Sequence, residues 1–425
     1  MGQTWIAIGL GIGYAVSWIF MAPRLRRFSI AANDSITIPQ YLTNRFLSKN
    51  KSLQILSAII FLVAYTIYAA SSIKACGTLF NTVMDIDPTV AMYIAAFIIV
   101  AYTFLGGFSA VCWTDFFQGM IMLAALLIAP LFALALAKAG DGAATGAALP
   151  DGFFNFFTTP QDIISGLGWG LGYFGMPQVL LRFMAIRSER ELTQSRRIAT
   201  IWVVISMFIA VCIGVIGYSV TAAGKVPFLA TSAESETIII KLADLMSQHG
   251  VLLAIMAGII LSGILAATMS TADSQLLAAA SSVSQDLMQH SFGIKMNQRT
   301  TMLAARATVI GIAIIGMVLA WDPNSSVFRV VSLAWAGFGA AFGPVMLFSL
   351  FWKRANKQGA LAGMITGGAV VFIWKYLIAP MGGAWAIYEL LPAFLAACIA
   401  IVAVSLATPA PETAITDTFD EIRGK

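Results

Sequence analysis

Residues 262–287 read SGILAATMSTADSQLLAAASSVSQDL and follow the apolar run VLLAIMAGIIL of residues 251–261, with no proline or loop cluster between the two. The pattern predicts one long helix over both stretches, because about 20 apolar residues are enough to cross a bilayer. The second half of this helix nevertheless carries several hydroxyl groups and one carboxylate, Asp273. Polar side chains at membrane depth normally face the interior of a helix bundle or a water-filled cavity. The stretch is therefore predicted to be a membrane helix with one functional face.

Helical spacing sorts the polar residues of this helix onto two neighbouring faces. Ala267, Ser270 and Thr271 lie at positions i, i+3 and i+4 on one face. Ser270, Asp273 and Ser274 share the adjacent face. A small residue that exposes its backbone carbonyl, next to two hydroxyls, offers oxygen ligands and neither nitrogen nor sulfur. Such a set suits a hard cation such as Na⁺ better than a transition metal.

The composition of the whole chain is that of a membrane protein with several spans. Of its 425 residues 59% are hydrophobic and 11% are charged, and the mean hydropathy is +0.85. Soluble domains are closer to half apolar and a quarter charged. The four cysteines occur singly with no CxxC spacing, and the two histidines form no ligand cluster. The cysteines are therefore interpreted as small apolar residues of packed helices.

Eleven apolar stretches are long enough to cross a membrane. They lie near residues 4–22, 53–80, 89–109, 113–138, 162–185, 198–222, 250–287, 302–321, 328–352, 359–380 and 385–407. Nineteen of the 25 Lys and Arg residues lie in, or close to, the segments that follow odd-numbered stretches, so that successive crossings place them all on the same side of the membrane. Because cytoplasmic loops carry the excess of basic residues, this asymmetry predicts the N-terminus outside and the C-terminus in the cytoplasm.

The connecting segments differ in character. Residues 23–51 mix basic and apolar residues and are expected to form one or two helices on the cytoplasmic surface. Residues 234–248 are amphipathic and predict a short external helix, whereas 139–160 predict an external loop rich in Gly, Ala and Pro. Residues 106–107, both glycine, predict a tight cytoplasmic turn. The tail from Pro409 is polar and is expected to be disordered.

The fifth apolar stretch is poorly suited to a continuous helix. It reads GLGWGLGYFGMPQ from Gly166 to Gln178, with five glycines and one proline in thirteen residues. Discontinuous helices of inverted-repeat transporters expose free N–H and C=O groups to ligands at the membrane midplane. Close packing of glycines between helices is the alternative explanation, and the proline beside the repeated glycines favours a broken helix. Trp169 and Tyr173, at i and i+4, are candidates to line an apolar slot with a polar rim.

Asp115 lies at the start of the fourth stretch, and two explanations of it stay open. Its carboxylate would complement the dipole at a helix N-terminus. Alternatively it would supply a second cation site together with Ser270, Asp273 and Ser274. Arg182, at the inner end of the predicted broken helix, is expected to have a structural role.

Several stretches resemble the sodium:solute symporter family and, within it, the bacterial proline carriers. They are WIAIGL, TIPQYLTNRF, YTFLGGF, GWGLGYFG, ILAATMST, SLAWAGFGAAFGPVMLFS and KQGALAGMITGG, in the expected order and spacing from Trp5 to the C-terminal tail. The resemblance implies an all-α polytopic membrane protein with the leucine-transporter-like inverted-repeat fold. It divides the chain into a transmembrane domain at 1–408 and a cytoplasmic tail at 409–425. The domain would comprise a partial first repeat at 1–140, a second repeat at 161–355 and two extra C-terminal spans at 358–408.

The resemblance also implies roles for individual residues. One sodium ion would bind Ala267, Ser270 and Thr271, together with carbonyl groups of a first broken helix. The substrate would contact Tyr68, Trp169, Tyr173 and Pro177. Asp115 matches a carboxylate that is important for sodium dependence, and with Asp273 and Ser274 it forms a possible second cation site. Asp273 departs from the proline carriers, which have a hydroxyl at its position.

Members of the family have two further spans before Trp5, on the order of 60–75 residues with their loops. The resemblance therefore implies about 11 transmembrane helices in this chain, without the first core helix, and an N-terminally truncated form is expected. The implied activity is sodium-driven import of L-proline, with no bond chemistry and no cofactor other than Na⁺ as coupling ion.

The expected partners are the solute, Na⁺ and the lipid bilayer, with no nucleic acid and no obligate protein partner. The expected location is the bacterial cytoplasmic membrane, with Met1 on the outer side. Two alternatives stay open. The chain would carry another solute of the family, such as a different amino acid, pantothenate, a monocarboxylate or sialic acid, or it would be a remnant that does not transport.

Overall fold

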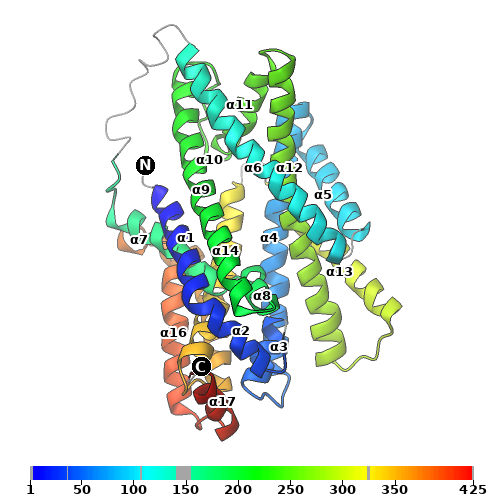
Figure 1. Cartoon of the computed structure of the whole chain (residues 1–425), viewed down its shortest axis with the longest axis vertical. Coiled ribbons are helices and arrows are strands. Elements are labelled where there is room, and N and C mark those ends of the chain that lie inside the picture. Colours follow the sequence, from blue (N-terminus) through cyan, green and yellow to red (C-terminus); the bar gives the residue numbers. More distant parts are fainter. Residues whose placement is uncertain (1–2, 36, 106–107, 140–154, 323–325, 424–425) are drawn as a thin grey trace.

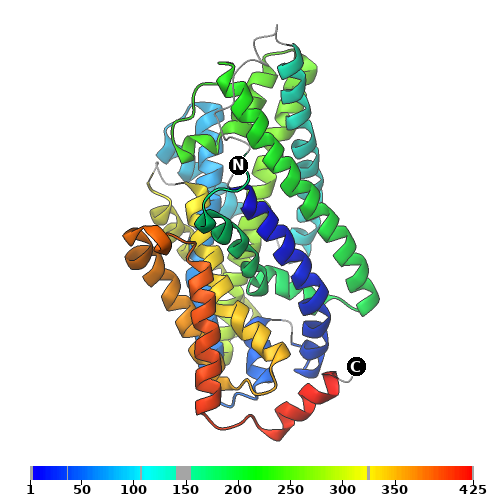
Figure 2. The same ribbon diagram turned by 90° about the vertical axis from the view of Figure 1, so that its left-hand side faces the viewer.

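The computed structural model describes residues 3–35, 37–105, 108–139, 155–322 and 326–423, and the regular secondary structure within these ranges is helical. Figures 1 and 2 show a bundle of long helices that run mostly along one axis. The longer helices are α1 (Thr4–Val16), α4 (Ser52–Met84), α5 (Pro88–Leu105), α6 (Phe108–Ala139), α9 (Glu189–Ala222), α12 (Val251–Ser281), α13 (Gln298–Leu319), α14 (Val327–Phe351), α15 (Lys357–Ile373) and α16 (Leu390–Ala407).

Within the described ranges, nine helical segments are long and apolar enough to cross a membrane. They coincide with nine of the eleven stretches that the sequence predicts. The other two correspond to α5, whose apolar run is shorter (Pro88–Ala101), and to residues 160–185, which are divided into several pieces. Nine of the predicted spans are thus borne out within the described residues, and a total of about 11 further requires that α5 and the divided segment each cross the membrane.

The long polar-faced helix is present. α12 continues directly into the π-helix η3 (Ser282–Ser291), so that residues 251–291 are helical throughout. α12 packs mainly against α6 and α4. Asp273 and Gln275, in its polar half, are 0% and 2% exposed. One face of the helix thus points into the bundle, as its composition predicts.

Residues 160–185 form a broken helix. The pieces are α7 (Pro160–Gly168), the 3-10 helix η2 (Trp169–Phe174) and α8 (Pro177–Ala185), with non-helical backbone at Gly175 and Met176. Pro177 begins α8, a position that proline tolerates because the first N–H groups of a helix have no partner within the helix. The prediction of a broken helix is confirmed.

The glycines of the broken helix also allow close contact with its neighbours. A Cβ at Gly166 or Gly170 would overlap α1, and Gly9 and Gly13 of α1 provide matching space. A Cβ at Gly175 would overlap the backbone of α14. The two explanations that the sequence left open therefore both apply, since the helix is broken and its glycines are also packing positions.

The basic segment after α1 forms two helices, as predicted. α2 (Ala22–Ala31) continues from α1 through the π-helix η1 (Ser17–Met21), and α3 (Ile38–Arg45) follows. Arginines of this segment contact the ends of other helices. Arg24 Nε donates to Leu350 O at 2.5 Å and Arg45 Nε donates to Ser349 O at 3.1 Å, both near the C-terminus of α14. Cations at this end of a helix satisfy carbonyl groups that lack a partner within it.

The last residues differ from the prediction. Residues 413–423, expected to be disordered, form the amphipathic helix α17 (Thr413–Arg423), which packs against α2 (Figure 2). Ile415, Phe419 and Ile422 are buried. The Phe419 ring lies 5.3 Å from the guanidinium carbon of Arg24. Disorder was wrong here because three apolar residues at helical spacing meet an apolar face of the bundle.

Residues 234–248, predicted as one short helix, form parts of α10 (Ser232–Ser235) and α11 (Ile238–Ser247). Glu236 lies between the two and accepts hydrogen bonds from Ser326 Oγ at 2.6 Å and from the N–H groups of Val327 and Phe328 at 3.0 Å each. A carboxylate at a helix N-terminus satisfies unpaired N–H groups and complements the dipole. The α10–α11 pair is thereby fastened to α14. Most of the predicted loop at 139–160, and the turn at 106–107, lie outside the described residues.

Candidate functional site

A polar cavity of about 200 Å³ lies between α4, α6, α8 and α12. Its lining residues are Tyr65, Asp115, Gln178, Arg182, Ser270, Thr271, Ser274 and Gln275. They supply hydroxyl, carboxamide and carboxylate oxygens and one guanidinium group. A concave space with a few convergent polar groups between helices is a typical ligand site. We call this space the polar cavity.

Two of the three predicted sodium ligands line the polar cavity. Ser270 Oγ and Thr271 Oγ1 both donate to the carbonyl oxygen of Ala267, at 3.2 and 2.9 Å. Because each hydroxyl hydrogen points toward this carbonyl, the oxygen lone pairs remain available to the cavity. Ala267 itself does not line the cavity. The three residues form one unit in which the backbone orients two hydroxyl oxygens.

The residues predicted for a second cation are only partly together. Asp115 and Ser274 line the polar cavity next to Ser270, whereas Asp273 does not. The lining positions 270, 271, 274 and 275 define one face of α12, and Asp273 lies outside it because successive residues turn by about 100°. Asp115 Oδ1 is buried and has no hydrogen bond to a residue that the structure describes. A cation between α6 and α12 would therefore meet Asp115 and Ser274 but not Asp273.

Trp169, predicted to contact substrate, is enclosed by other aromatic rings. Its ring stacks on those of Phe328, at a centroid distance of 5.1 Å, and Tyr388, at 4.8 Å. The interplanar angles are 24° and 11°, and the Trp169 side chain is buried. The Trp169 carbonyl also accepts a hydrogen bond from Trp335 Nε1 at 3.0 Å. In this structure the Trp169 side chain belongs to an aromatic cluster between the broken helix, α14 and the residues before α16.

Tyr173 belongs to the same cluster but lies on another side of it. Its ring packs edge-on against Tyr14 and Trp335, each at a centroid distance of 5.0 Å. The sequence spacing suggested that Trp169 and Tyr173 share a helix face. In a 3-10 helix such as η2, residues four apart are separated by about 120°, which is wider than in an α-helix, yet both rings contact Trp335.

The other two predicted substrate residues are near the polar cavity without lining it. Pro177 begins α8 and precedes the lining residue Gln178. Tyr68 packs against the main hydrophobic core, less than one turn along α4 from the lining residue Tyr65. The substrate contacts of these residues and of the aromatic cluster stay predictions.

Four residues of the polar cavity were not assigned to a site from the sequence: Tyr65, Gln178, Arg182 and Gln275. Gln275 follows Thr271 at i+4, so the face argument that selected Thr271 applies to it as well. Gln178 occupies the second position of α8, which only a located helix break would reveal. Its Oε1 accepts a weak hydrogen bond from Tyr65 Oη at 3.4 Å. Arg182, expected to be structural, also lines the cavity.

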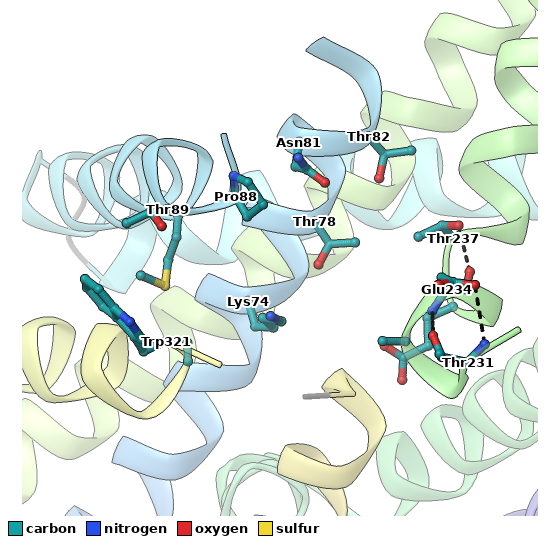
Figure 3. A pocket seen from close by; sticks show the side chains of 15 residues that line it. Lys74, Thr78, Asn81, Thr82, Pro88, Thr89, Thr231, Glu234, Thr237 and Trp321 are labelled. Carbon is teal, nitrogen blue, oxygen red and sulfur yellow. Dashed lines mark hydrogen bonds between the residues drawn. The ribbon is translucent and has the colours of Figure 1, made fainter. Parts of the chain in front are cut away.

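A second polar cavity, of about 250 Å³, lies between α4, α5, the α10–α11 pair and the end of α13. Figure 3 shows Lys74 and Thr78 of α4 between Glu234 on one side and Trp321 on the other. Lys74 Nζ donates to the carbonyl oxygen of Asp322 at 2.8 Å. No residue predicted for a site lines this space, whereas Asp115, Ser270, Thr271 and Ser274 line the polar cavity.

A helical membrane bundle with a broken helix beside an oxygen-lined cavity has the architecture of an ion-coupled secondary transporter. The comparison with protein families narrows this class. The model of the sodium:solute symporter family matches residues 1–367. The chain belongs to the sodium:solute symporter family.

Individual relatives match along nearly the whole chain. The high-affinity proline transporter PutP of Bacillus subtilis is 42% identical over 99% of this chain and 87% of that protein. The sodium/proline symporter of Haemophilus influenzae is 40% identical over 99% of this chain and 84% of that protein.

Solved structures show the same fold at low sequence identity. A Na⁺-coupled sialic acid symporter in a substrate-bound outward-open state has a TM-score of 0.75 at 19% identity, with 96% of this chain and 84% of that chain covered. Mhp1, a transporter of the nucleobase-cation-symport-1 family, has a TM-score of 0.54 at 14% identity, with coverages of 99% and 95%. The fold is thus the leucine-transporter-like helical bundle that the sequence resemblance implied.

Proposed function

We propose that the protein imports L-proline together with sodium across the bacterial cytoplasmic membrane. The polar cavity carries this proposal, because it is bounded by the oriented hydroxyls of Ser270 and Thr271 on one side and by α8 of the broken helix on the other. An ion and a solute bound there would share one space at a helix break, as in inverted-repeat transporters. The names of the two relatives support proline as the solute.

The cycle follows from differential binding to two states. Sodium at Ala267, Ser270 and Thr271 favours the outward-open state and orders the solute site, and rocking of the second repeat (161–355) against the first then releases both inside. The solute is held by Tyr68, Trp169, Tyr173 and Pro177. Because Trp169 is buried and stacked on Phe328 and Tyr388 here, its contact with the solute requires the aromatic cluster to open. A second cation binds at Asp115 and Ser274.

The orientation proposed has Met1 outside and the C-terminus in the cytoplasm, as the distribution of basic residues predicts. With this orientation the polar cavity extends from Ser270 and Thr271 toward the cytoplasmic end of α12. Ion and solute would leave through it.

Reconstitution of the 425-residue chain in liposomes tests this function. An inward sodium gradient is expected to drive transient accumulation of labelled L-proline, whereas an equal potassium gradient is expected to drive none. Excess unlabelled L-proline should abolish the uptake, and other amino acids, pantothenate, a monocarboxylate and sialic acid should leave most of it. If one of these solutes competes more strongly than L-proline, that solute is the substrate instead of proline. Uptake that ignores sodium would refute the coupling.

A further inference from the structure

Gln275 carries a buried amide for which the transport cycle described above has no use. The residue is 2% exposed and lines the polar cavity. Neither its Oε1 nor its Nε2 has a hydrogen-bond partner among the residues that the structure describes. An unpaired buried amide destabilises a fold, so such a group is normally satisfied by a ligand, by water or in another conformation.

The position of Gln275 relates it to the sodium ligands. It follows Thr271 by four residues and Ser274 by one, and all three line the same cavity wall. Four residues of α-helix correspond to a rise of about 6 Å. In the proposed orientation this step leads from Thr271 toward the cytoplasm, which is the direction of ion release.

One carboxylate and one guanidinium group line the cavity, and the carboxylate is the charged partner that a cation near Gln275 would have. The Asp115 carboxylate lines the same space, and its buried Oδ1 has no hydrogen bond to a described residue. Arg182 is the one cationic side chain of the lining, and it is exposed. A carboxamide oxygen is a hard ligand of the kind that alkali and alkaline-earth cations prefer.

We propose, on the basis of the sodium coupling proposed above, that Gln275 Oε1 binds sodium after the ion leaves Ser270 and Thr271. The residue thus forms a release station one helical turn further toward the cytoplasm. The adjoining space of about 200 Å³ holds several water molecules at about 30 Å³ each, and the buried amide meets the ion when its side chain turns into this space. Each departing ion exchanges with this water.

Inhibition by sodium from the inside tests the release station. Proteoliposomes with the wild-type chain, Gln275→Leu, Gln275→Glu and Gln285→Leu are compared for two quantities. These are the external sodium concentration for half-maximal proline uptake and the internal sodium concentration for half-maximal inhibition. Gln285, exposed in the η3 continuation of the same helix, is the matched control.

Gln275→Leu is expected to raise the internal sodium concentration for half-maximal inhibition at least tenfold. The external sodium concentration for half-maximal uptake should change less than threefold. Gln275→Glu keeps oxygen ligands and should retain internal inhibition, and Gln285→Leu should match the wild type. Without sodium, the thermal midpoint of Gln275→Leu in detergent should not be lower than that of the wild type, because the substitution removes an unpaired buried amide. A packing role predicts the opposite shift.

Three results would overturn the release station while leaving sodium-coupled transport intact. Equal shifts of both sodium constants would place Gln275 in the Thr271 site or in ordinary packing. Unchanged constants would mean that the amide does not meet the ion. A change confined to the apparent KM for proline would assign Nε2 to the solute carboxylate. If the wild type shows no sodium-driven uptake, sodium binding is measured instead by the sodium concentration that gives half-maximal thermal stabilisation. The release station predicts that this concentration is at least threefold higher in Gln275→Leu than in the wild type.

Discussion

At the scale of single residues, the backbone of α12 orients two hydroxyls that we propose as sodium ligands. Ser270 and Thr271 donate to the same carbonyl oxygen, that of Ala267. Thr268 makes the equivalent bond to Ile264 O at 2.8 Å but does not line the polar cavity. The bond to the preceding turn is therefore common to several hydroxyls of the helix, and only the face on which a hydroxyl lies gives it access to an ion.

Thr271→Ala is expected to raise the sodium concentration for half-maximal uptake at least tenfold, because it removes one of the oxygen ligands. Thr271→Ser keeps the hydroxyl and should change this concentration less than threefold. Thr268→Ala removes a hydroxyl of the same local geometry outside the cavity and should match the wild type. Sodium-activation curves of uptake measure all three. Equal effects of the alanine variants at 268 and 271 would contradict the assigned site.

How far the sequence predicts the site depends on local periodicity. Ser270, Thr271 and Ser274 were found because residues three and four apart share a helix face. Asp273 was grouped with them, although the face that lines the cavity excludes it, because a stripe of polar residues does not show where its edge lies. Tyr65 and Gln178 come from other helices, and only the packing of the bundle reveals which of their residues meet α12.

At the scale of helices, the sequence predicted the long spans and the break, but not the details of their ends. Proline and five glycines indicated that residues 166–178 do not continue as an α-helix. The 3-10 form of η2 was not predictable, because it follows from contact with α1 and α14 on both sides. As a result, Trp169 and Tyr173 are separated by a wider angle about the helix axis than α-helical spacing predicts.

α17 shows the same limit at the C-terminus. The polar composition of residues 413–423 predicted disorder, yet Ile415, Phe419 and Ile422 find a binding face on the bundle. The ion pair between Lys353 and Asp420 adds little, since both side chains are about half exposed. Apolar contact therefore holds this helix, and contact with a distant surface cannot be seen in the local sequence.

Phe419→Ala is expected to release α17 from the bundle. Loss of a buried Phe side chain costs about 3 kcal/mol or more, so protection of the amides of residues 413–423 against hydrogen exchange should fall on the order of 100-fold. Asp417→Asn changes an exposed position of the same helix and should leave exchange unchanged. Mass spectrometry of peptides from this segment measures the effect. Normal protection in Phe419→Ala would mean that another contact holds the helix.

At the scale of the whole molecule, composition and apolar stretches predicted a polytopic bundle, and the length and apolar character of its helices bear this out. The number of ions that cross with each solute is not predictable from such features. It depends on whether side chains from α6 and α12 meet at one point. In the structure Asp115 and Ser274 do line one cavity, and Asp273 does not, which separates the two acidic residues that the sequence placed together.

This separation predicts different effects of the two carboxylates on coupling. At zero membrane potential, a symporter that moves n sodium ions accumulates its solute until the solute ratio equals the sodium ratio raised to the power n. A tenfold sodium gradient stores about 1.4 kcal/mol per ion, so it supports roughly tenfold accumulation with one ion and roughly 100-fold with two. If cations bind both at Thr271 and at Asp115, the wild type should approach the roughly 100-fold accumulation expected for two ions.

Asp115→Asn should lower the exponent from two toward one, because a neutral amide no longer balances the second cation. Asp273→Asn should keep the wild-type exponent, because its side chain is buried outside the cavity wall, and should instead lower the thermal stability of the purified protein. Steady-state proline accumulation at several sodium ratios, with the potential clamped by valinomycin and equal potassium, gives the exponent directly. An exponent of one in the wild type would remove the second cation from the cycle. A lower exponent in Asp273→Asn alone would place that cation on the other side of α12.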